Sequence, residues 1–335
     1  MKVIRLKAPG GLDHLTMVEV PEAAAPGKGE ITVRLHASSL NYHDYRVMAV
    51  PGSVADGRIP MSDGAGVVEA VGAGVTSFRP GDHVVSHFFP GWISGEPYLP
   101  GFETTPGDGV DGYARERVTV PDFFFTQAPK GWSHEEAATI TTAGLTAWRA
   151  LIVNGNLKAG DTVLVLGTGG VSIAALQLAK AMGATVIATS SSDEKRARLE
   201  ALGAAHTLNY KTQPDWGTGV NDWTGGRGVD HVVEVGGPGT LPQSIEAVRV
   251  GGHISLIGVL TGRSGEVPTG ALMRKQARLH GLIVGNRVQQ QDYVRALEAT
   301  GIRPVIDSSF PLEKIADAFR HEESGRHFGK ICLTW

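Results

Sequence analysis

Cysteine is almost absent from this sequence. The 335 residues contain only Cys332, in the strand-like C-terminal segment ICLTW. A single cysteine excludes an internal disulfide and any zinc site built on several cysteines. The start, MKVIRLKAPG, alternates polar and apolar residues instead of forming a signal peptide, and no uncharged apolar segment reaches membrane-spanning length. We therefore expect a cytoplasmic protein with no membrane partner.

An excess of either charge is also missing. Lys plus Arg number 31 and Asp plus Glu 34, and no long run of one sign occurs. The protein therefore lacks the excess of positive charge that usually attracts nucleic acid and anionic membranes. What the chain does contain is 41% hydrophobic residues and 45 glycines, a composition typical of a globular protein rich in tight turns. Its length exceeds that at which a single core usually keeps growing, which favours two domains.

The pattern of strands and helices changes along the chain. In the first third, Ile31, Val33 and Leu35 alternate with polar residues, which indicates a mostly β domain. From about residue 122, apolar strands alternate with helical periodicity, the pattern of parallel strands joined by crossover helices. The strands expected there are residues 162–166, 185–189, 231–235, 253–257 and 279–284. Further helices at 289–300 and 312–321 precede a last strand at 330–334, which we expect to return to the first domain. The predicted domains are 1–121 with 300–335, and 122–299.

A glycine-rich turn follows the strand at 162–166 and opens an amphipathic helix. The turn consists of Gly167, Thr168, Gly169, Gly170 and Val171. Gly167 permits the tight turn, Gly169 lets the backbone approach a pyrophosphate, and free amides at the helix N-terminus face the negative charge. Ser172 replaces the usual glycine or alanine, which predicts slightly weaker packing of helix on strand. Such turns are also common as plain structural elements. The flanking strand and helix, with a second strand following, favour dinucleotide binding.

The end of the second strand bears on which dinucleotide is bound. In dinucleotide-binding βαβ units, an acidic residue at the end of the second strand accepts hydrogen bonds from the free 2′-hydroxyl of NADH. Here the segment reads Ser190, Ser191, Ser192, Asp193, Glu194 and Lys195. The acid position, nearest Ser190, is neutral, and Lys195 follows within reach of a 2′-phosphate, which predicts NADPH. Ser191 or Ser192 is equally typical of a helix cap with Lys195 as a solvated charge, and the two roles are compatible.

A series of longer segments carries a family resemblance over nearly the whole chain. The segments are GAGVVEAVGAGVTSFRPGDHVV (64–85), AATITTAGLTAWRAL (137–151), VLVLGTGGVSIAALQLAKAMGA (163–184), HTLNY (206–210) and GKICL (329–333). In this order they resemble the medium-chain dehydrogenase/reductase superfamily, and within it the zinc-free quinone oxidoreductase-like branch. The resemblance implies an α/β protein, with a GroES-like β-rich catalytic domain, a Rossmann doubly wound parallel-sheet domain, and the active site in the cleft between them.

The resemblance also implies where the cofactor and a partner subunit bind. Besides the glycine-rich turn, the residues expected at NADP(H) are Thr142, Ser190, Ser191, Lys195, Tyr210, Gly258 and Lys330. Of these, Ser190, Lys195 and Tyr210 are expected to surround the 2′-phosphate, and Thr142 and Lys330 to lie near the cofactor. The strand at 279–284 is similar to the one through which the family's Rossmann domains commonly pair, so a homodimer is implied.

No metal site is expected. Zinc alcohol dehydrogenases of this superfamily hold catalytic zinc with two cysteines and a histidine, and the matching positions here are Asn41, Ser62 and Thr142, none a competent zinc ligand. The loop matching the four-cysteine structural lobe contains no cysteine. His83 and His87 share a face if they lie in one strand, but residues four apart span roughly 13 Å, too far to chelate an ion.

Without a metal, oxidation of simple alcohols loses its main electrostatic support. A quinone or an enal needs less help, because hydrogen-bond donors or water can stabilise the developing oxyanion. Asn41 is the leading candidate to position substrate or nicotinamide, and Tyr42, His43 and Tyr45 are candidate donors. The family often reads Asn-x-x-Asp-x-Tyr, whereas Arg46 stands at the tyrosine position here. Each of these side chains is equally consistent with simply holding the loop.

The aromatic residues Phe88, Phe89 and Trp92, with the loop to Tyr98, fit either a wall of the cleft or ordinary core. The leading functional hypothesis is an NADPH-dependent oxidoreductase acting on a small-molecule electrophile, a quinone, enal or enone. The second is an NADPH-linked carbonyl reductase or alcohol dehydrogenase that works through protein donors instead of zinc. The third, from another class, is an NADPH-binding sensor or structural protein with little turnover.

Overall fold

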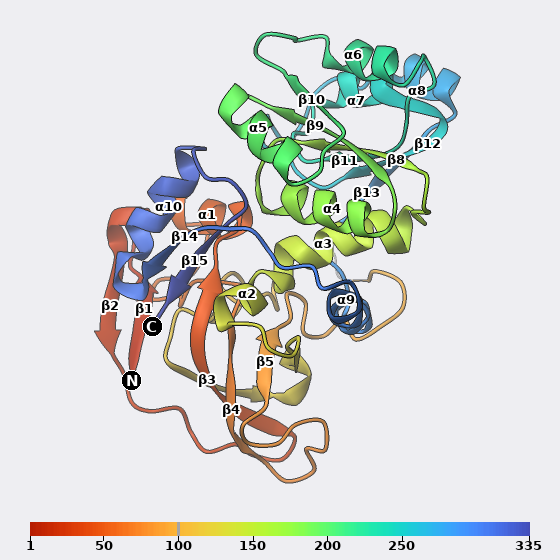
Figure 1. Cartoon of the computed structure of the whole chain (residues 1–335). Helices are drawn as coiled ribbons and strands as arrows, with labels where there is room; N and C mark the ends of the chain where they lie inside the picture. Colours follow the sequence, from red (N-terminus) through yellow and green to blue (C-terminus); the bar gives the residue numbers. More distant parts are fainter. Residues whose placement is uncertain (99–100) are drawn as a thin grey trace. The chain divides into compact units, whose positions relative to one another are not determined.

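The computed structural model describes residues 1–98 and 101–335. The chain forms two compact units, Met1–Leu145 with Val284–Trp335, and Thr146–Ile283. The first is rich in β-strands, and the second alternates strands and helices (Figure 1). This is the α/β class expected from the sequence. No helix in the described part of the chain is both long enough and apolar enough to cross a membrane.

The first unit is built mainly from strands of the N-terminal third and the C-terminal tail. Its elements are β1 (Lys2–Leu6), β2 (Leu15–Glu19), β3 (Glu30–Ser39), α1 (Tyr42–Ala49), β4 (Ala65–Val71), β5 (His83–Ser86), β6 (Arg117–Pro121), β7 (Phe125–Gln127), α2 (His134–Ala138), α9 (Arg287–Thr300), β14 (Ile306–Pro311), α10 (Ile315–Glu323) and β15 (Lys330–Thr334). A π-helical segment, Ile140–Gly144, follows α2, and α3 (Leu145–Trp148) spans the boundary between the units.

The main sheet of this unit has the order β14-β15-β3-β4-β5-β7, and β6 also pairs with β3. In β3 the side chains of Ile31, Val33 and Leu35 are buried, as their alternation predicts. Strand β15 pairs antiparallel with β3, Cys332 lying opposite Ser39. The C-terminal strand β15 therefore belongs to the main sheet of the first unit.

The compact units differ from the predicted domain boundaries at two places. Residues 122–145 and α9 belong to the first unit, although the sequence pattern put both in the second domain. The physical reason is tertiary pairing, because β7 hydrogen-bonds with β5. The buried Gln290 of α9 donates through Nε2 to Thr126 Oγ1 at 2.7 Å and to the carbonyl of Ser86 at 2.9 Å. A change in the hydrophobic periodicity of the sequence carries no information about such contacts between distant segments.

The second unit alternates strands with helices. Its elements are β8 (Thr162–Leu166), α4 (Gly170–Ala181), β9 (Thr185–Ser190), α5 (Asp193–Ala201), β10 (His206–Asn209), α6 (Trp216–Trp223), β11 (Val229–Glu234), α7 (Leu241–Ala247), β12 (Val248–Leu256), α8 (Thr269–Lys275) and β13 (Arg278–Gly281). A further π-helical segment, Arg149–Asn154, precedes β8.

All six strands of the second unit are parallel, in the order β10-β9-β8-β11-β12-β13. Helices α4 and α5 lie on one side of the sheet and α6, α7 and α8 on the other (Figure 1). Successive residues Val163, Leu164 and Val165 are all buried, as expected for a strand covered on both faces. Strand β13 ends at Gly281, short of the predicted 284, because Val284 has a φ of +46° that an extended strand excludes.

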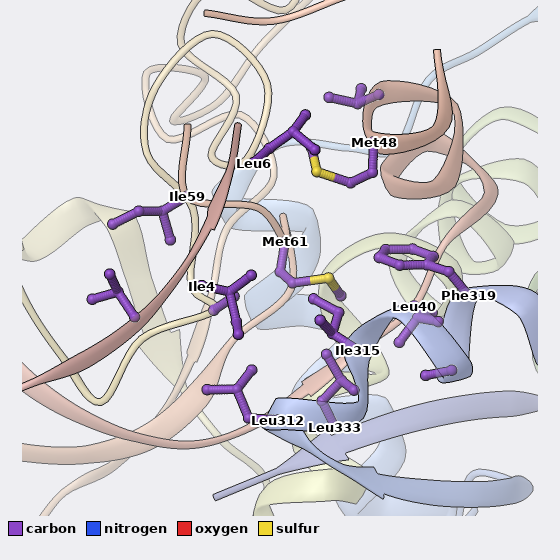
Figure 2. Packing of buried hydrophobic residues seen from close by; sticks show 14 of the residues in the cluster. Ile4, Leu6, Leu40, Met48, Ile59, Met61, Leu312, Ile315, Phe319 and Leu333 are labelled. Carbon is purple, nitrogen blue, oxygen red and sulfur yellow. The ribbon is translucent and has the colours of Figure 1, made fainter. Parts of the chain in front are cut away.

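A cluster of buried apolar side chains positions the part of the first unit that contains the candidate site (Figure 2). It joins β1, α1, α10, β15 and the segment before β4, and includes Met48 and Phe319. Leu40, Met61 and Ile331 belong to the same cluster. Each is next to, or within two residues of, a polar residue discussed below. The apolar core therefore sets where those polar groups meet.

Replacing Phe319 with alanine tests this core. The ring is fully buried, so Phe319→Ala should lower the free energy of unfolding by about 3–5 kcal/mol through lost burial and an unfilled cavity. Urea denaturation followed by circular dichroism measures the change. The matched control is Phe123→Ala, whose ring is exposed and should cost clearly less. Equal losses in both variants would contradict the assignment of this cluster as the core.

Candidate functional site

A buried carboxylate, Asp63, accepts three side-chain hydrogen bonds within the first unit. Ser39 Oγ donates to Asp63 Oδ2 at 2.6 Å, and Asn41 Nδ2 donates to the same oxygen at 2.8 Å. Thr142 Oγ1 donates to Oδ1 at 2.6 Å. Asp63 is wholly inaccessible to solvent. The carboxylate therefore links the end of β3, the start of α1 and the π-helical segment after α2.

A buried lysine completes this group. Lys330 Nζ donates to the carbonyl of Leu40 and, at 2.6 Å, to Asn41 Oδ1, and lies 3.8 Å from Asp63 Oδ2. The amide nitrogen of Asn41 also donates to Asp44 Oδ2 at 3.0 Å. Both polar atoms of the Asn41 side chain are thus engaged, and the residue is nearly buried. We call Asn41, Asp44, Asp63, Thr142 and Lys330 the buried polar cluster.

Local backbone structure brings these side chains together. Asn41 is the N-cap residue of α1, and Lys330 is the first residue of β15, beside β3. Met61 has a φ of +80°, a conformation that is costly for a residue with a side chain and is held here by the surrounding core. The chain direction it imposes leads to Ser62, whose amide donates to Asp44 Oδ1 at 2.9 Å.

Burial governs the electrostatics of the buried polar cluster. It raises the pKa of Asp63 to about 6, with a further rise from the charge of Asp44, against the opposing effects of Lys330 and the hydroxyl donors. A third carboxyl, Glu322 of α10, has a buried Oε2 with no hydrogen-bond partner in the described chain. Burial raises the pKa of Glu322 to about 8; Asp44 adds to the rise and Lys330 opposes it. One ammonium is therefore shared by more carboxyl groups than it can neutralise.

The three positions that match zinc ligands in zinc alcohol dehydrogenases do not fit a zinc ion. Asn41 and Thr142 both donate to Asp63, and the Asn41 carbonyl oxygen already accepts from the Lys330 ammonium. Ser62 contributes a neutral hydroxyl, which is a poor zinc ligand. A dication here would also face the nearby ammonium. Among residues 1–98 and 101–335, no group of three or more His, Cys, Asp or Glu side chains is arranged to hold a metal.

His83 and His87 have different environments. The ring of His83 stacks on His134 with centroids 4.9 Å apart, and His134 in turn stacks on His36 at 4.7 Å. His87 is buried just beyond β5, and burial lowers its pKa to about 4. The two side chains are therefore engaged in separate packing arrangements.

The candidate donors of α1 have separate surroundings. The Tyr45 hydroxyl donates to Glu323 Oε1 at 2.6 Å, which raises the pKa of Tyr45 to about 12. Tyr42 is exposed. His43 Nε2 lies 3.3 Å from Asp108 Oδ2, although the angle is not that of a hydrogen bond.

The His43 ring also packs against two aromatic side chains. It lies edge-on to Phe88, with centroids 5.3 Å apart, and 4.6 Å from the ring of Phe102. Phe88, Phe89 and Trp92 are buried, which supports the core alternative for these residues, whereas Tyr98 is exposed. His43 therefore lies at the edge of an aromatic cluster.

The glycine-rich turn of the second unit has an open surface. Gly167 has a φ of +71°, which glycine adopts without strain, and it follows β8 directly. A side chain at Gly167 or Gly169 would meet no described atom within 4 Å. Gly169 is the N-cap of α4, and no described side chain caps that helix. This turn fits a phosphate group, which needs backbone amides and room to approach.

Ser172 takes part in the packing of α4. Its hydroxyl donates to the carbonyl of Leu166 at 2.6 Å, and the residue is buried. We predicted that serine here slightly weakens the contact of helix and strand. The hydrogen bond instead ties the first turn of α4 to the end of β8.

Ser190 and Tyr210 come together at the carboxyl edge of the sheet. Ser190 ends β9 opposite Asn209 of β10, and the Tyr210 amide donates to the Ser190 carbonyl at 3.0 Å. In the same region Ser192 Oγ accepts from the Lys195 amide at 3.2 Å. The helix cap predicted at Ser191 or Ser192 is therefore confirmed at Ser192.

Gly258 lies just beyond β12, at the same edge. A Cβ there would lie 2.1 Å from the carbonyl oxygen of Val235, so only glycine fits. Its predicted contact with the cofactor stays a prediction.

Three acidic residues were missed by sequence reasoning. Asp63 and Glu322 carry no motif signal, because their partners are distant in the chain. Glu234 ends the apolar strand β11 and accepts from the amides of Gly236 and Gly237, at 2.7 and 3.0 Å, and from the hydroxyls of Thr240 and Ser244. An acid at the end of a buried strand followed by two glycines was the available signal for this last residue.

The raised pKa of Glu322 predicts how stability depends on pH. A carboxyl whose pKa is higher in the folded than in the unfolded protein favours folding when protonated, and this contribution is lost as pH rises from about 4.5 to about 8. Glu322→Gln cannot ionise, so it should gain stability relative to the unaltered protein between pH 5 and pH 8. Urea denaturation at both pH values measures this. The control is Glu323→Gln, at the exposed residue next to Glu322, which should show no such gain in stability. The same change of stability with pH in both variants would contradict the raised pKa of Glu322.

Comparison with known proteins places this arrangement in a family. Residues 27–130 match the alcohol dehydrogenase GroES-like domain, and residues 170–300 match the zinc-binding dehydrogenase domain. A zinc-type alcohol dehydrogenase-like protein of Schizosaccharomyces pombe is 40% identical over 324 residues, which cover 94% of this chain and 93% of that protein.

Two solved structures are similar over the full length of the chain. An NAD-dependent alcohol dehydrogenase is 36% identical, with a TM-score of 0.90 and coverage of 100% of both chains. A quinone oxidoreductase from Pseudomonas syringae is 29% identical, with a TM-score of 0.83 and coverage of 100% of this chain and 99% of that one. The chain thus belongs to the medium-chain dehydrogenase/reductase superfamily of oxidoreductases.

Proposed function

We propose that this protein is an NADPH-dependent oxidoreductase that transfers hydride to a quinone or an activated alkene without zinc. The observation that carries the proposal is the chemistry of the buried polar cluster and of Ser62 next to it in the chain. Where zinc relatives have thiolates and an imidazole, this chain has an amide and two hydroxyls, and the Asn41 oxygen already accepts from Lys330. Conjugated acceptors are the class of substrate that depends least on a Lewis acid.

The second unit supplies the cofactor site in this proposal. Residues 167–171 would hold the pyrophosphate, because the space beside Gly167 and Gly169 is open and lets a phosphate approach the backbone. When bound, the reduced nicotinamide supplies the hydride. The NAD-dependent alcohol dehydrogenase among the similar proteins supports a nicotinamide cofactor.

The preference for NADPH is supported by the end of β9. Ser190 is neutral where an acid would favour NADH. The nearest acid, Asp193, accepts from Asn209 Nδ2 at 3.1 Å and from Arg196 Nη1 at 3.0 Å. These bonds, both to Oδ1, tie Asp193 to α5 and β10. Lys195, in the first turn of α5, supplies a positive charge in the same region.

The first unit supplies proton and hydrogen-bond chemistry. Asp63 holds Thr142 through its hydroxyl, and with Lys330 it keeps Asn41 in one orientation. We assign Asn41 a positioning role in which it orders its neighbours, and contact with substrate stays a prediction. Among the donor candidates we favour His43, which faces Asp108 at the edge of the aromatic cluster. Tyr45 is less suited, because its hydroxyl is committed to Glu323 and its pKa is raised.

Two further proposals concern substrate and assembly. The names of the alcohol dehydrogenase relatives favour, as a second candidate, the reduction of a saturated carbonyl.

A homodimer through β13 is supported by the position of this strand at the edge of the sheet and by the exposure of Arg278, His280 and Gly281. An exposed edge strand leaves backbone donors and acceptors free for pairing with another chain.

An assay of NADPH oxidation tests the proposed function. The purified protein, treated with a chelator, is given a quinone, an enal or a saturated aldehyde, and absorbance of the reduced nicotinamide is followed. We expect turnover of the quinone or the enal that is unchanged by the chelator. Turnover of the saturated aldehyde only would favour the second candidate. Tight NADPH binding with no turnover would instead indicate a sensor or structural protein.

A side chain added to the glycine-rich turn should block the cofactor without unfolding the protein. Gly169 has an ordinary negative φ of −77°, and the space beside it is open, so Gly169→Ala should fold normally. Its methyl group would occupy the approach to the amides, and NADPH affinity should fall at least about tenfold. Fluorescence titration measures the affinity. The matched control, Gly281→Ala, also meets open space and should bind NADPH normally.

Removing one charge tests the preference between cofactors. Lys195→Ala should weaken NADPH about tenfold to a hundredfold, because a charge-assisted hydrogen bond to the 2′-phosphate is lost. NADH, which lacks that phosphate, serves as the internal control and should bind with unchanged affinity. Dissociation constants for both cofactors, from fluorescence titration, give the comparison. Unaltered NADPH affinity would remove Lys195 from the proposed site.

A further inference from the structure

The second unit contains a polar cavity at the edge of the sheet where the strands begin. Its volume is about 160 Å³, and its lining includes Asn156, Lys158, Asp161, His231, Arg249 and Arg278. The glycine-rich turn follows the opposite end of β8, a strand of five residues that spans roughly 17 Å. This cavity is therefore distinct from the proposed dinucleotide site.

The two acids that line the cavity already have partners. Asp230 accepts from Arg227 Nη2 at 2.7 Å, from Arg249 Nε at 2.5 Å and from the Thr162 amide at 2.8 Å. Burial opposes its ionisation, but these donors hold the pKa of Asp230 well below its usual range. The second acid, Asp161, accepts from the Lys158 amide at 2.9 Å, and its Oδ2 lies 3.1 Å from His231 Nε2.

The groups left without partners are those that can bind an anion. The Lys158 ammonium and the Arg278 guanidinium have neither an ion pair nor a side-chain hydrogen bond to the residues that the structure describes. His231 is buried, and its Nδ1 is enclosed with no hydrogen-bond partner in the same set. An unsatisfied buried ring nitrogen is costly unless a ligand or water completes it. His231 also lines the cavity.

We propose that this cavity binds a small oxyanion with two negative charges, of which inorganic phosphate is the simplest. The cavity is smaller than the roughly 300–1,000 Å³ of sites for drug-sized molecules, so an ion of a few atoms fits it better than a nucleotide. The guanidinium of Arg278 can donate to two oxygens as a fork, and Lys158 adds a compact charge.

A ligand here would join several strands. Asp161 precedes β8, His231 lies in β11, Arg249 in β12 and Arg278 begins the edge strand β13. An anion held by these residues ties β13 to the middle of the sheet. Because it binds the folded state only, its occupancy stabilises the second unit.

Titration calorimetry with inorganic phosphate, at constant ionic strength, tests the proposal. The glycine-rich turn also accepts phosphate, so the informative quantity is the difference between the unaltered protein and its variants. Arg278→Ala and Lys158→Ala should each weaken one class of phosphate site by at least about tenfold. The control is Arg274→Ala, an exposed residue of α8 outside the cavity, which should leave binding unchanged. Crystals soaked in tungstate should show anomalous density beside His231 and Arg278.

Three outcomes would overturn the proposal. They are phosphate binding identical in all three variants and the unaltered protein, no phosphate binding to the unaltered protein at millimolar concentration, and tungstate bound at the glycine-rich turn with none in the cavity. Unfolding temperatures measured with and without phosphate give a further check. Arg278→Ala that folds normally but gains less stability from phosphate than the unaltered protein supports the site, because a purely structural role would not depend on the anion.

Discussion

The buried contact of Lys330 with Asn41, next to Asp63, is the constraint on which the first unit's site depends. Removing charged groups from water is costly, so they persist in a core only with close partners. Here the ammonium has two oxygen acceptors, and the carboxylate has three donors. The apolar cluster around Met61, Leu40 and Ile331 keeps water out and leaves the polar groups little freedom to move.

In the proposed function, this constraint lets the family fold work without zinc. The same backbone positions that hold a metal in zinc alcohol dehydrogenases carry an amide and two hydroxyls here, and an internal ammonium provides the positive charge. A fixed ammonium cannot be exchanged and cannot bind substrate oxygen in an open coordination position. Substrates that need little activation are therefore the natural match to the arrangement, which is the physical basis of the proposed function.

The second unit uses its two sheet edges differently. At the carboxyl edge, glycines expose backbone amides at the start of α4, which suits a phosphate group on a bound cofactor. At the amino edge, side chains such as Arg249 and Arg278 provide the positive charge around a smaller cavity. Backbone amides leave room for a large ligand, whereas long cationic side chains fill space and favour a small one.

The sequence determined the features that depend on residues close together in the chain. The glycine-rich turn, its flanking strand and helix, the cap at Ser192 and the class of fold all follow from local spacing and hydrophobic period. Tertiary structure alone decided the partners of Asp63, the burial of Glu322 Oε2, the membership of α9 in the first unit and the cavity at Arg278. These depend on contacts such as that of Lys330 with Asn41, which are separated by 289 positions. Local patterns carry no signal for pairs so distant, because only the packed core brings them together.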